Sequence, residues 1–239
     1  MSGSLQNEVV RGALLDLIGK PFGESRIVVI IDAILPFPGS KAVLLKHLVE
    51  YQSLGWAEFD VLSLHAGPPS LVESRLRSAD VVFGYGGSNH WLAHSWHATG
   101  LAPVLRELLD EKVYLGLSAG SMIFSTQHAA AVDAFDDQEE VDMLGLDSVR
   151  PALPLFDWYL APHLGSAYLP NQTEEWAAAA ATRLGGSVWF IDDDTALLVR
   201  DPTAEPEVVS SGRWLHFEGG QLLSESERRP VAGAGVLGE

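Results

Sequence analysis

Residues 112–120, Lys-Val-Tyr-Leu-Gly-Leu-Ser-Ala-Gly, decide the fold of this chain. The first six form a short apolar run that is typical of a buried strand, and Gly116 to Gly120 then fit the pattern G-x-S-x-G. In this pattern the glycines allow a sharp turn from a strand into a helix, with the serine at its apex. We therefore expect Ser118 to adopt a strained backbone conformation, with its hydroxyl above the end of a sheet and near the N-terminus of a helix.

Similar apolar runs precede this stretch at regular intervals and predict strands at 26–31, 57–64 and 80–84. The segments between the strands have helical periodicity, which predicts helices at 40–51, 70–77 and 90–111. The longest of these helices should break near Gly100. Alternation of strands and helices favours right-handed βαβ units and a parallel sheet.

The pattern loosens after Ala119 and becomes regular again near the next predicted strand, Trp158 to Ala161. Asn171 and Glu174 fit a capping box for an alanine-rich helix. Short strands follow at 187–191, 195–199, 207–211 and 213–217. We predict one α/β domain over residues 1–239: a doubly wound, mostly parallel sheet with flanking helices and a small antiparallel extension near the C-terminus. Its ends are predicted as an N-terminal helix with its lead-in at 1–24 and a mobile tail at 224–239.

The composition limits the classes of function. The chain has 239 residues, of which 47% are hydrophobic, and a formal charge of −17, so it can form a sizeable core but would repel a nucleic acid. It has no cysteine, which excludes disulfides, cysteine-ligated metals and a cysteine nucleophile. The N-terminus lacks a signal-peptide pattern and no apolar run is long enough to span a membrane, so we expect a cytoplasmic protein with no membrane partner. No pattern indicates a cofactor.

A glycine-rich loop, Gly84 to Asn89, follows the strand that precedes the Ser118 strand. Adjacent strands of a doubly wound sheet end at the same edge, so we expect this loop next to the serine turn. The N–H of Ala119 and the N–H of Gly87 or Ser88 would then form an oxyanion hole. A plain turn or a phosphate loop is the alternative, although the loop has neither a Walker lysine nor G-x-G-x-x-G.

His163 is our candidate for the general base. It follows the strand at 158–161 and Pro162, which places it at the carboxyl end of a strand. A neutral imidazole there would accept the proton of Ser118 and donate it to the leaving group. The acid that orients this imidazole is harder to choose, because the segment between Ser118 and His163 offers several candidates: Asp133, Asp136, Asp137, Glu139, Glu140 and Asp142.

Three blocks of the sequence resemble the peptidase E and cyanophycinase family of serine peptidases. They are Gly86 to Asn89, Gly116 to Gly120, and Ala161-Pro162-His163, and their order and spacing agree with the family. The resemblance implies a fold like that of class I glutamine amidotransferases, with serine in place of cysteine. It also implies short peptide substrates and a homodimer.

The resemblance further implies the order serine, acid, histidine along the chain. Asp133 lies fifteen positions after Ser118 in a context similar to the family's aspartate, and it is our first choice for the acid. Asp137 and Glu140 remain open. Asn89, together with Gly87 and Ser88, would belong to the substrate-binding loop.

One departure from the family bears on the substrate. Members that select an N-terminal aspartate carry Thr-Arg-Glu after the histidine, where this chain has Thr173-Glu174-Glu175. A carboxylate there would repel an aspartate side chain, so strict selection of N-terminal Asp is not expected. We predict a serine exopeptidase that acts on short peptides through an acyl-enzyme. The alternatives are a cyanophycinase-like hydrolase of β-Asp-Arg units, with Glu174 receiving the guanidinium, and an inactive binding member of the fold.

Two further clusters contain residue types that can ligate a metal. His90, His94 and His97 share one face of a predicted helix, but the tryptophans of the same helix favour packing or a dimer contact. The run Asp192-Asp193-Asp194 lies between two predicted strands and fits a solvated turn better than a cation site. No metal is therefore predicted.

Overall fold

The first half of the chain forms a parallel four-stranded sheet. The computed structural model describes residues 1–3 and 5–226. The strands of this sheet are β1 (Arg26–Ile30), β2 (Glu58–Leu62), β3 (Val81–Gly84) and β4 (Val113–Gly116). Their spatial order is β2-β1-β3-β4 and every pairing is parallel. The four predicted strands of this half are confirmed.

Helices cover both faces of this sheet. They are α1 (Glu8–Ile18), α2 (Ala42–Gln52), α3 (Pro69–Ser78), α4 (Asn89–Ala98) and α5 (Ala102–Leu109). Successive side chains of β1 point to opposite faces, so Ile27 and Val29 pack with α1 and α2, whereas Val28 and Ile30 pack with α3, α4 and α5. The sheet is therefore doubly wound, as predicted, and the long predicted helix breaks near Gly100 into α4 and α5.

The second half forms a mixed sheet. Its strands are β5 (Trp158–Ala161), β6 (Ser187–Ile191), β9 (Trp214–Glu218) and β10 (Gln221–Glu225), in the order β10-β9-β6-β5. Only β5 and β6 pair in parallel, and the other pairings are antiparallel. β7 (Thr195–Leu198) and β8 (Glu207–Ser210) form a separate antiparallel pair. The predicted antiparallel extension near the C-terminus is confirmed.

Shorter elements complete the fold. Two of them flank β1, η1 (Phe22–Glu24) and η2 (Asp32–Ile34), and three lie between β4 and β5: η3 (Ser118–Ser121), α6 (Ala130–Phe135) and α7 (Gln138–Met143). α8 (Glu174–Leu184) packs on the second sheet. The model differs from the prediction at the cap of α8, because the side chain of Thr173, not Asn171, accepts from the N–H of Trp176. Most of the predicted tail at 224–239 lies outside the described residues, but Ser224 and Glu225 belong to β10.

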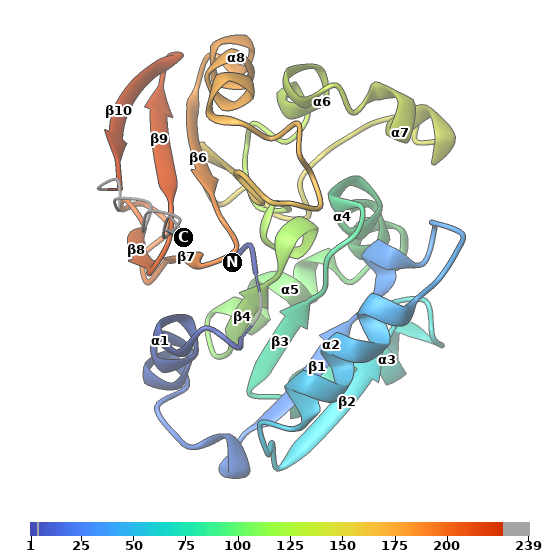
Figure 1. The fold of residues 1–239 in the computed structure, drawn as a ribbon. Helices are drawn as coiled ribbons and strands as arrows, with labels where there is room; N and C mark the ends of the chain where they lie inside the picture. Colours follow the sequence, from blue (N-terminus) through green and yellow to red (C-terminus); the bar gives the residue numbers. More distant parts are fainter. Residues whose placement is uncertain (4, 227–239) are drawn as a thin grey trace, which may run out of the picture.

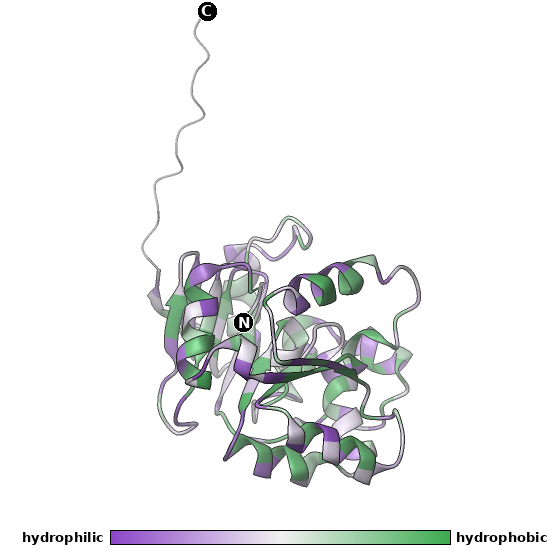
Figure 2. Cartoon of the chain, turned by 90° about the horizontal axis from the view of Figure 1, so that it is seen from below, coloured by the Kyte–Doolittle hydropathy of each residue, from purple (hydrophilic) through white to green (hydrophobic). Residues whose placement is uncertain are grey.

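Figure 1 shows the two sheets as separate bodies of strands, with the N-terminus lying between them near η3 and β6. In Figure 2 the outer helices alternate between hydrophilic and hydrophobic residues along their length, as expected for helices that bury one face. None of the helices in the described residues is long and apolar enough to cross a bilayer. The arrangement brings the carboxyl ends of β4 and β5 toward the same region, where the N-terminus also lies.

Candidate active site

Ser118 lies in the sharp turn that follows β4. Its φ angle is +50°, a left-handed conformation that is costly for a residue with a side chain. Glycine is required on both sides: a Cβ on Gly116 would lie 2.5 Å from the Cα of Ser121, and a Cβ on Gly120 would lie 2.0 Å from the carbonyl oxygen of Gly84. The strain predicted from the G-x-S-x-G pattern is thus present in the backbone.

The turn continues differently from the prediction. Only the short 3-10 helix η3 follows Ser118, and the next α-helix, α6, begins at Ala130. The hydroxyl of Tyr114 donates to the carbonyl of Gly120 over 2.8 Å and so ties the turn back to β4. Because η3 is so short, a helix dipole contributes little at Ser118, and nearby N–H groups are the remaining source of positive potential.

His163 reaches Ser118 from the second sheet. It follows β5 after Pro162, and its Nε2 lies 2.7 Å from the Oγ of Ser118. The φ angle of His163 is +69°, so both residues of the pair have left-handed backbones. The structure therefore brings together the two side chains expected to exchange a proton, at hydrogen-bond distance.

The carboxylate in contact with His163 is Asp193, which corrects the expected position of the acid. Its Oδ1 lies 2.7 Å from Nδ1 of His163. β5 and β6 are parallel neighbours, with Ala161 opposite Phe190. His163 and Asp193 each lie two residues after the end of their strand, so the parallel pairing places them side by side at one edge.

The acids favoured from the sequence lie elsewhere. Asp133 is exposed on α6, because its neighbours Ala131, Val132 and Ala134 occupy the buried face of that helix. Asp137 approaches the Nε2 of His90 at 3.2 Å, and Glu140 accepts a hydrogen bond from the hydroxyl of Ser88. In the described residues none of Asp133, Asp137 and Glu140 forms a hydrogen bond with His163.

A signal for Asp193 was present in the sequence. It stands just after a predicted strand, as His163 does, and a parallel pairing of those two strands would have brought both residues to one edge. The run Asp192 to Asp194 also forms the turn that its composition predicts: the carboxylate of Asp192 accepts from the N–H of Asp194 and from the hydroxyl of Thr195.

Asp193 is suited to orienting the imidazole. The hydrogen bond with His163 lowers the pKa of the Asp193 carboxyl, partial burial opposes this, and the hydroxyls of Ser2 and Ser166 lower the pKa further. The carboxylate is therefore ionised at neutral pH and acts as an acceptor, which assigns the proton of the neutral imidazole to Nδ1. Nε2 is then left as an acceptor for the hydroxyl of Ser118.

The glycine-rich loop meets the serine turn as expected, but its donors are arranged differently. A Cβ on Gly86 would lie 3.1 Å from the Cβ of Ser118, so this loop passes directly beside the nucleophile. The N–H of Ser88 donates to the carbonyl of Ala33 at 2.9 Å and is already used. Within residues 1–3 and 5–226, the N–H groups of Gly87 and Ala119 donate to no backbone carbonyl.

The side chains of Ser88 and Asn89 have structural contacts. Ser88 caps α4 by accepting from the N–H of Trp91 at 3.0 Å. The amide of Asn89 donates to the hydroxyl of Tyr159 at 3.2 Å, and both residues are buried. These contacts fix the loop between α4 and β5 and leave its backbone as the part nearest to Ser118.

The three histidines of α4 do not converge. His90 pairs with Asp137, His97 lies 2.8 Å from the carbonyl of Pro151, and His94 stacks on Trp91. No group of three or more metal-ligating side chains in the described part of the chain is arranged to hold a metal ion. Each of the three histidines therefore has a different contact in this structure.

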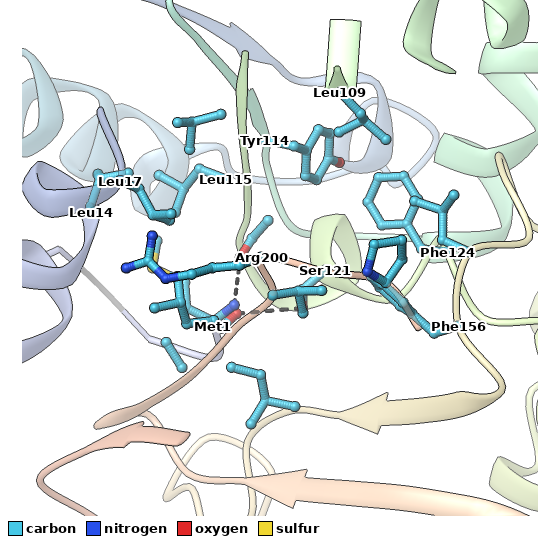
Figure 3. A pocket seen from close by; sticks show the side chains of 18 of the residues that line it. Met1, Leu14, Leu17, Leu109, Tyr114, Leu115, Ser121, Phe124, Phe156 and Arg200 are labelled. Atoms are coloured by element: carbon cyan, nitrogen blue, oxygen red, sulfur yellow. Dashed lines mark hydrogen bonds between the residues drawn. The ribbon is translucent and has the colours of Figure 1, made fainter. Parts of the chain in front are cut away.

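Two cavities flank the site. One of about 650 Å³ lies behind the serine turn, where Met1, Tyr114 and Phe124 line it, and neither Ser118 nor His163 does (Figure 3). A smaller one of about 350 Å³ lies beside Asp193 and is lined by Ser166, Glu174 and Arg213, among others. The guanidinium of Arg213 lies 3.1 Å from the carboxylate of Glu174, so that carboxylate is already paired.

Comparison with known proteins gives a family match and matches to solved structures. The model of peptidase family S51 matches residues 1–206. The fold is similar to that of a candidate peptidase E protein from Listeria monocytogenes EGD-e, with a TM-score of 0.69 and 19% identity over 88% of this chain and 96% of that one. It is also similar to a peptidase from an acI-B1 actinobacterium, with a TM-score of 0.62 and 19% identity over 93% and 94% of the two chains. No curated protein matches the sequence.

Proposed function

Because the chain belongs to peptidase family S51 and is therefore a serine-type peptidase acting on peptides, we propose that it is an exopeptidase that cleaves short peptides through an acyl-enzyme on Ser118. The observation that carries this proposal is the continuous chain of contacts from Ser118 Oγ to His163 Nε2 and from Nδ1 to Asp193, each 2.7 Å long. Such a chain is the arrangement that activates a serine hydroxyl.

The proposed reaction has two halves. His163 accepts the proton of Ser118 as Oγ attacks the peptide carbonyl, and it then donates this proton to the leaving amine. A water molecule, deprotonated by the same imidazole, attacks the acyl-enzyme; the acyl–Oγ bond breaks, His163 returns the proton to Oγ of Ser118, and the acid product leaves. Asp193 keeps the imidazole oriented and stabilises its positive charge in both halves. The N–H groups of Gly87 and Ala119 would stabilise the oxyanion, since neither donates to a backbone carbonyl in the described residues.

The side-chain preference is proposed from the cavity beside Asp193. Glu174 is exposed and pairs with Arg213, so the cavity offers neither a free guanidinium for an aspartate side chain nor an unpaired Glu174 for a substrate arginine. We therefore expect no strict preference for N-terminal Asp. The pairing of Glu174 also weakens the alternative of a cyanophycinase-like hydrolase of β-Asp-Arg units.

A hydrolysis screen tests the proposal. It would compare aminoacyl p-nitroanilides, free dipeptides and tripeptides, their N-acetylated counterparts, Asp-X peptides and β-Asp-Arg. We expect cleavage of short peptides with free N-termini, little cleavage of acetylated ones, and none by a Ser118→Ala variant that folds normally. Peptide cleavage retained in Ser118→Ala would overturn the mechanism, and rapid release from β-Asp-Arg alone would favour the alternative.

We further propose that the chain forms a homodimer and lies in the cytoplasm. The resemblance to the peptidase E family implies a homodimer, which light scattering on the purified chain would test against a monomer. The expected cytoplasmic location would be tested by fractionation of the cells that produce the protein.

A further inference from the structure

The N-terminal residues contact both halves of the active site. The carbonyl of Met1 accepts from the N–H of Ser118 at 2.9 Å, and the hydroxyl of Ser2 accepts from the N–H of His163 at 2.7 Å. Two successive residues of one segment therefore satisfy the backbone donors of the nucleophile and the base. Ser118 and His163 both have left-handed backbones, and such backbones persist only when the surrounding structure holds them.

The Ser2 hydroxyl also binds the acid. It donates to Oδ1 of Asp193 at 2.8 Å, and this is the same oxygen that contacts Nδ1 of His163. The Oγ of Ser2 itself lies 3.3 Å from Nδ1. One hydroxyl thus touches the backbone of the base, its ring and the carboxylate that orients it.

The segment is fitted closely to this position. Ser2 is fully buried, and its N–H donates to the carbonyl of Thr195 at 3.3 Å. A Cβ on Gly3 would lie 2.0 Å from the carbonyl oxygen of Asp193, so the chain can pass only with glycine there. In Figure 3 the backbone of Met1 lies against Ser121 and the end of β4, with hydrogen bonds drawn to both.

A buried hydroxyl needs hydrogen-bond partners wherever it lies, but the side-chain contacts of Ser2 go to His163 and Asp193 alone among the described residues. We propose that Ser2 is a positioning residue of the triad, whose hydroxyl holds the Asp193 carboxylate and the His163 backbone in the geometry that Ser118 requires. This inference rests on the proposed function of the Ser118, His163 and Asp193 site.

The chemistry explains why a second donor on Oδ1 of Asp193 matters. When His163 accepts the proton of Ser118, the imidazolium must keep its hydrogen bond to Asp193 while Nε2 turns from acceptor to donor. Without Ser2, Oδ1 would be held by Nδ1 of His163 alone, and the longer bond from Ser166 to Oδ2 would remain as a weaker restraint on rotation about the Cβ–Cγ bond. The Ser2 hydroxyl restrains that rotation and leaves Oδ1 facing Nδ1.

The test compares Ser2→Ala, which removes the hydroxyl, with Ser2→Cys, which keeps the volume but bonds weakly. The matched control is Ser25→Ala: Ser25 is also fully buried, and its hydroxyl donates to the carbonyl of Pro21 at 2.9 Å, at the opposite end of β1 from the site. The measurements are the rate of labelling by a fluorophosphonate, the low-field proton resonance of Nδ1–H in His163, and the melting temperature.

We expect labelling to slow by about 10- to 100-fold in Ser2→Ala, because a hydrogen bond to a charged group is lost. Ser2→Cys should also be slow, and the Nδ1–H resonance should shift or broaden in both. Ser25→Ala should label at the wild-type rate.

Labelling and resonance unchanged in Ser2→Ala, in a protein whose wild type is labelled, would overturn the role of Ser2 alone. Equal slowing in Ser25→Ala would also overturn it, because a general loss of stability would then explain the effect. A wild type that is not labelled at Ser118 would contradict the proposed function, and this inference with it.

Discussion

The two halves of the molecule hold their active-site residues in different ways. On the first sheet, Ser118 is held by backbone packing: a single Cβ added to Gly116 or to Gly120 would collide with main-chain atoms. On the second sheet, His163 and Asp193 are held by side-chain hydrogen bonds, from Ser2 and Ser166 among others. Close packing of main chain tolerates no substitution, whereas hydrogen bonds can be removed one at a time. We therefore expect all-or-none effects in the first region and graded effects in the second.

The largest effect expected in the second region is at the acid. Asp193→Asn keeps the shape of the side chain but lets its amide donate to Nδ1, which favours the wrong tautomer of His163. We expect kcat/KM to fall by roughly 10²- to 10⁴-fold with little loss of stability. Steady-state kinetics on the best peptide of the screen would measure this fall.

Asp133→Asn is the matched control for that experiment. Asp133 is exposed on α6, so this variant should retain wild-type kinetics. The reverse pattern, with activity lost in Asp133→Asn and retained in Asp193→Asn, would require the site to rearrange when substrate binds.

Gly120→Ala tests the packing of the first region. The added Cβ would lie 2.0 Å from the carbonyl oxygen of Gly84, so either the turn or β3 must move. We expect the free energy of unfolding to fall by roughly 2–4 kcal/mol and activity to be lost. Urea unfolding measures the first and the peptide assay the second.

Gly12→Ala provides the contrast. Gly12 lies within α1, and a Cβ there meets nothing within 4 Å. Alanine should stabilise the protein by roughly 0.5–1 kcal/mol, because glycine is the poorer helix former. Equal destabilisation in the two variants would show that the close contact at Gly120 is not what matters.

His128 reports on the junction between the halves. It is fully buried, with its ring 5.1 Å from that of His90 on α4 and 6.5 Å from that of Tyr159 on β5. Burial, and after it the neighbouring imidazole of His90, lower the pKa of His128 from 6.5 to about 4, while the hydrogen bond with the carbonyl of Met122 opposes the shift. The unfolded chain therefore binds a proton at higher pH than the folded one does, so stability falls as the pH drops from 6.5 toward 4.

His128→Asn removes this titration and retains a polar group near the carbonyl of Met122, which His128 contacts at 3.3 Å. The loss of unfolding free energy between pH 7.5 and pH 4.5 should be smaller in the variant by roughly 2–3 kcal/mol. Urea titrations at the two pH values would measure it. The same loss in both proteins would mean that His128 is not held neutral at the junction.

The smallest expected effect is at Ser166, whose hydroxyl donates to Oδ2 of Asp193 at 3.2 Å. This bond is longer than that of Ser2 and reaches the carboxylate oxygen that does not face His163. Ser166→Ala should lower kcat/KM by only about 2- to 5-fold. A loss of kcat/KM as large as that in Ser2→Ala would show that the two hydroxyls contribute equally, and it would contradict the expectation that effects in this region are graded.

The parts of the site that were predictable are those with local causes. The G-x-S-x-G turn is a backbone requirement expressed within five residues, and the doubly wound sheet follows from apolar runs that alternate with helical segments. His163 could be placed at a strand end because β5 has a clear apolar pattern. Each of these inferences used only neighbours in the sequence.

The parts that were missed depend on pairing between distant segments. Asp193 lies beside His163 only because β5 and β6 pair in parallel with one particular register, whereas the acid-rich segment at 133–142 lies nearer to Ser118 along the chain. Ser2 carries no recognisable motif, and its contacts arise from a segment that crosses between the two sheets. The hydrogen bond from the N–H of Ser88 to the carbonyl of Ala33 likewise depends on how the glycine-rich loop packs on η2.

The most direct test of the central claim, that Ser118, His163 and Asp193 act as one triad, is fluorophosphonate labelling followed by peptide mass spectrometry. We predict one adduct, on the peptide containing Ser118, and labelling that is at least tenfold slower in His163→Ala and in Asp193→Asn but unchanged in Asp133→Asn. Absence of an adduct on Ser118, or labelling of His163→Ala at the wild-type rate, would contradict the claim.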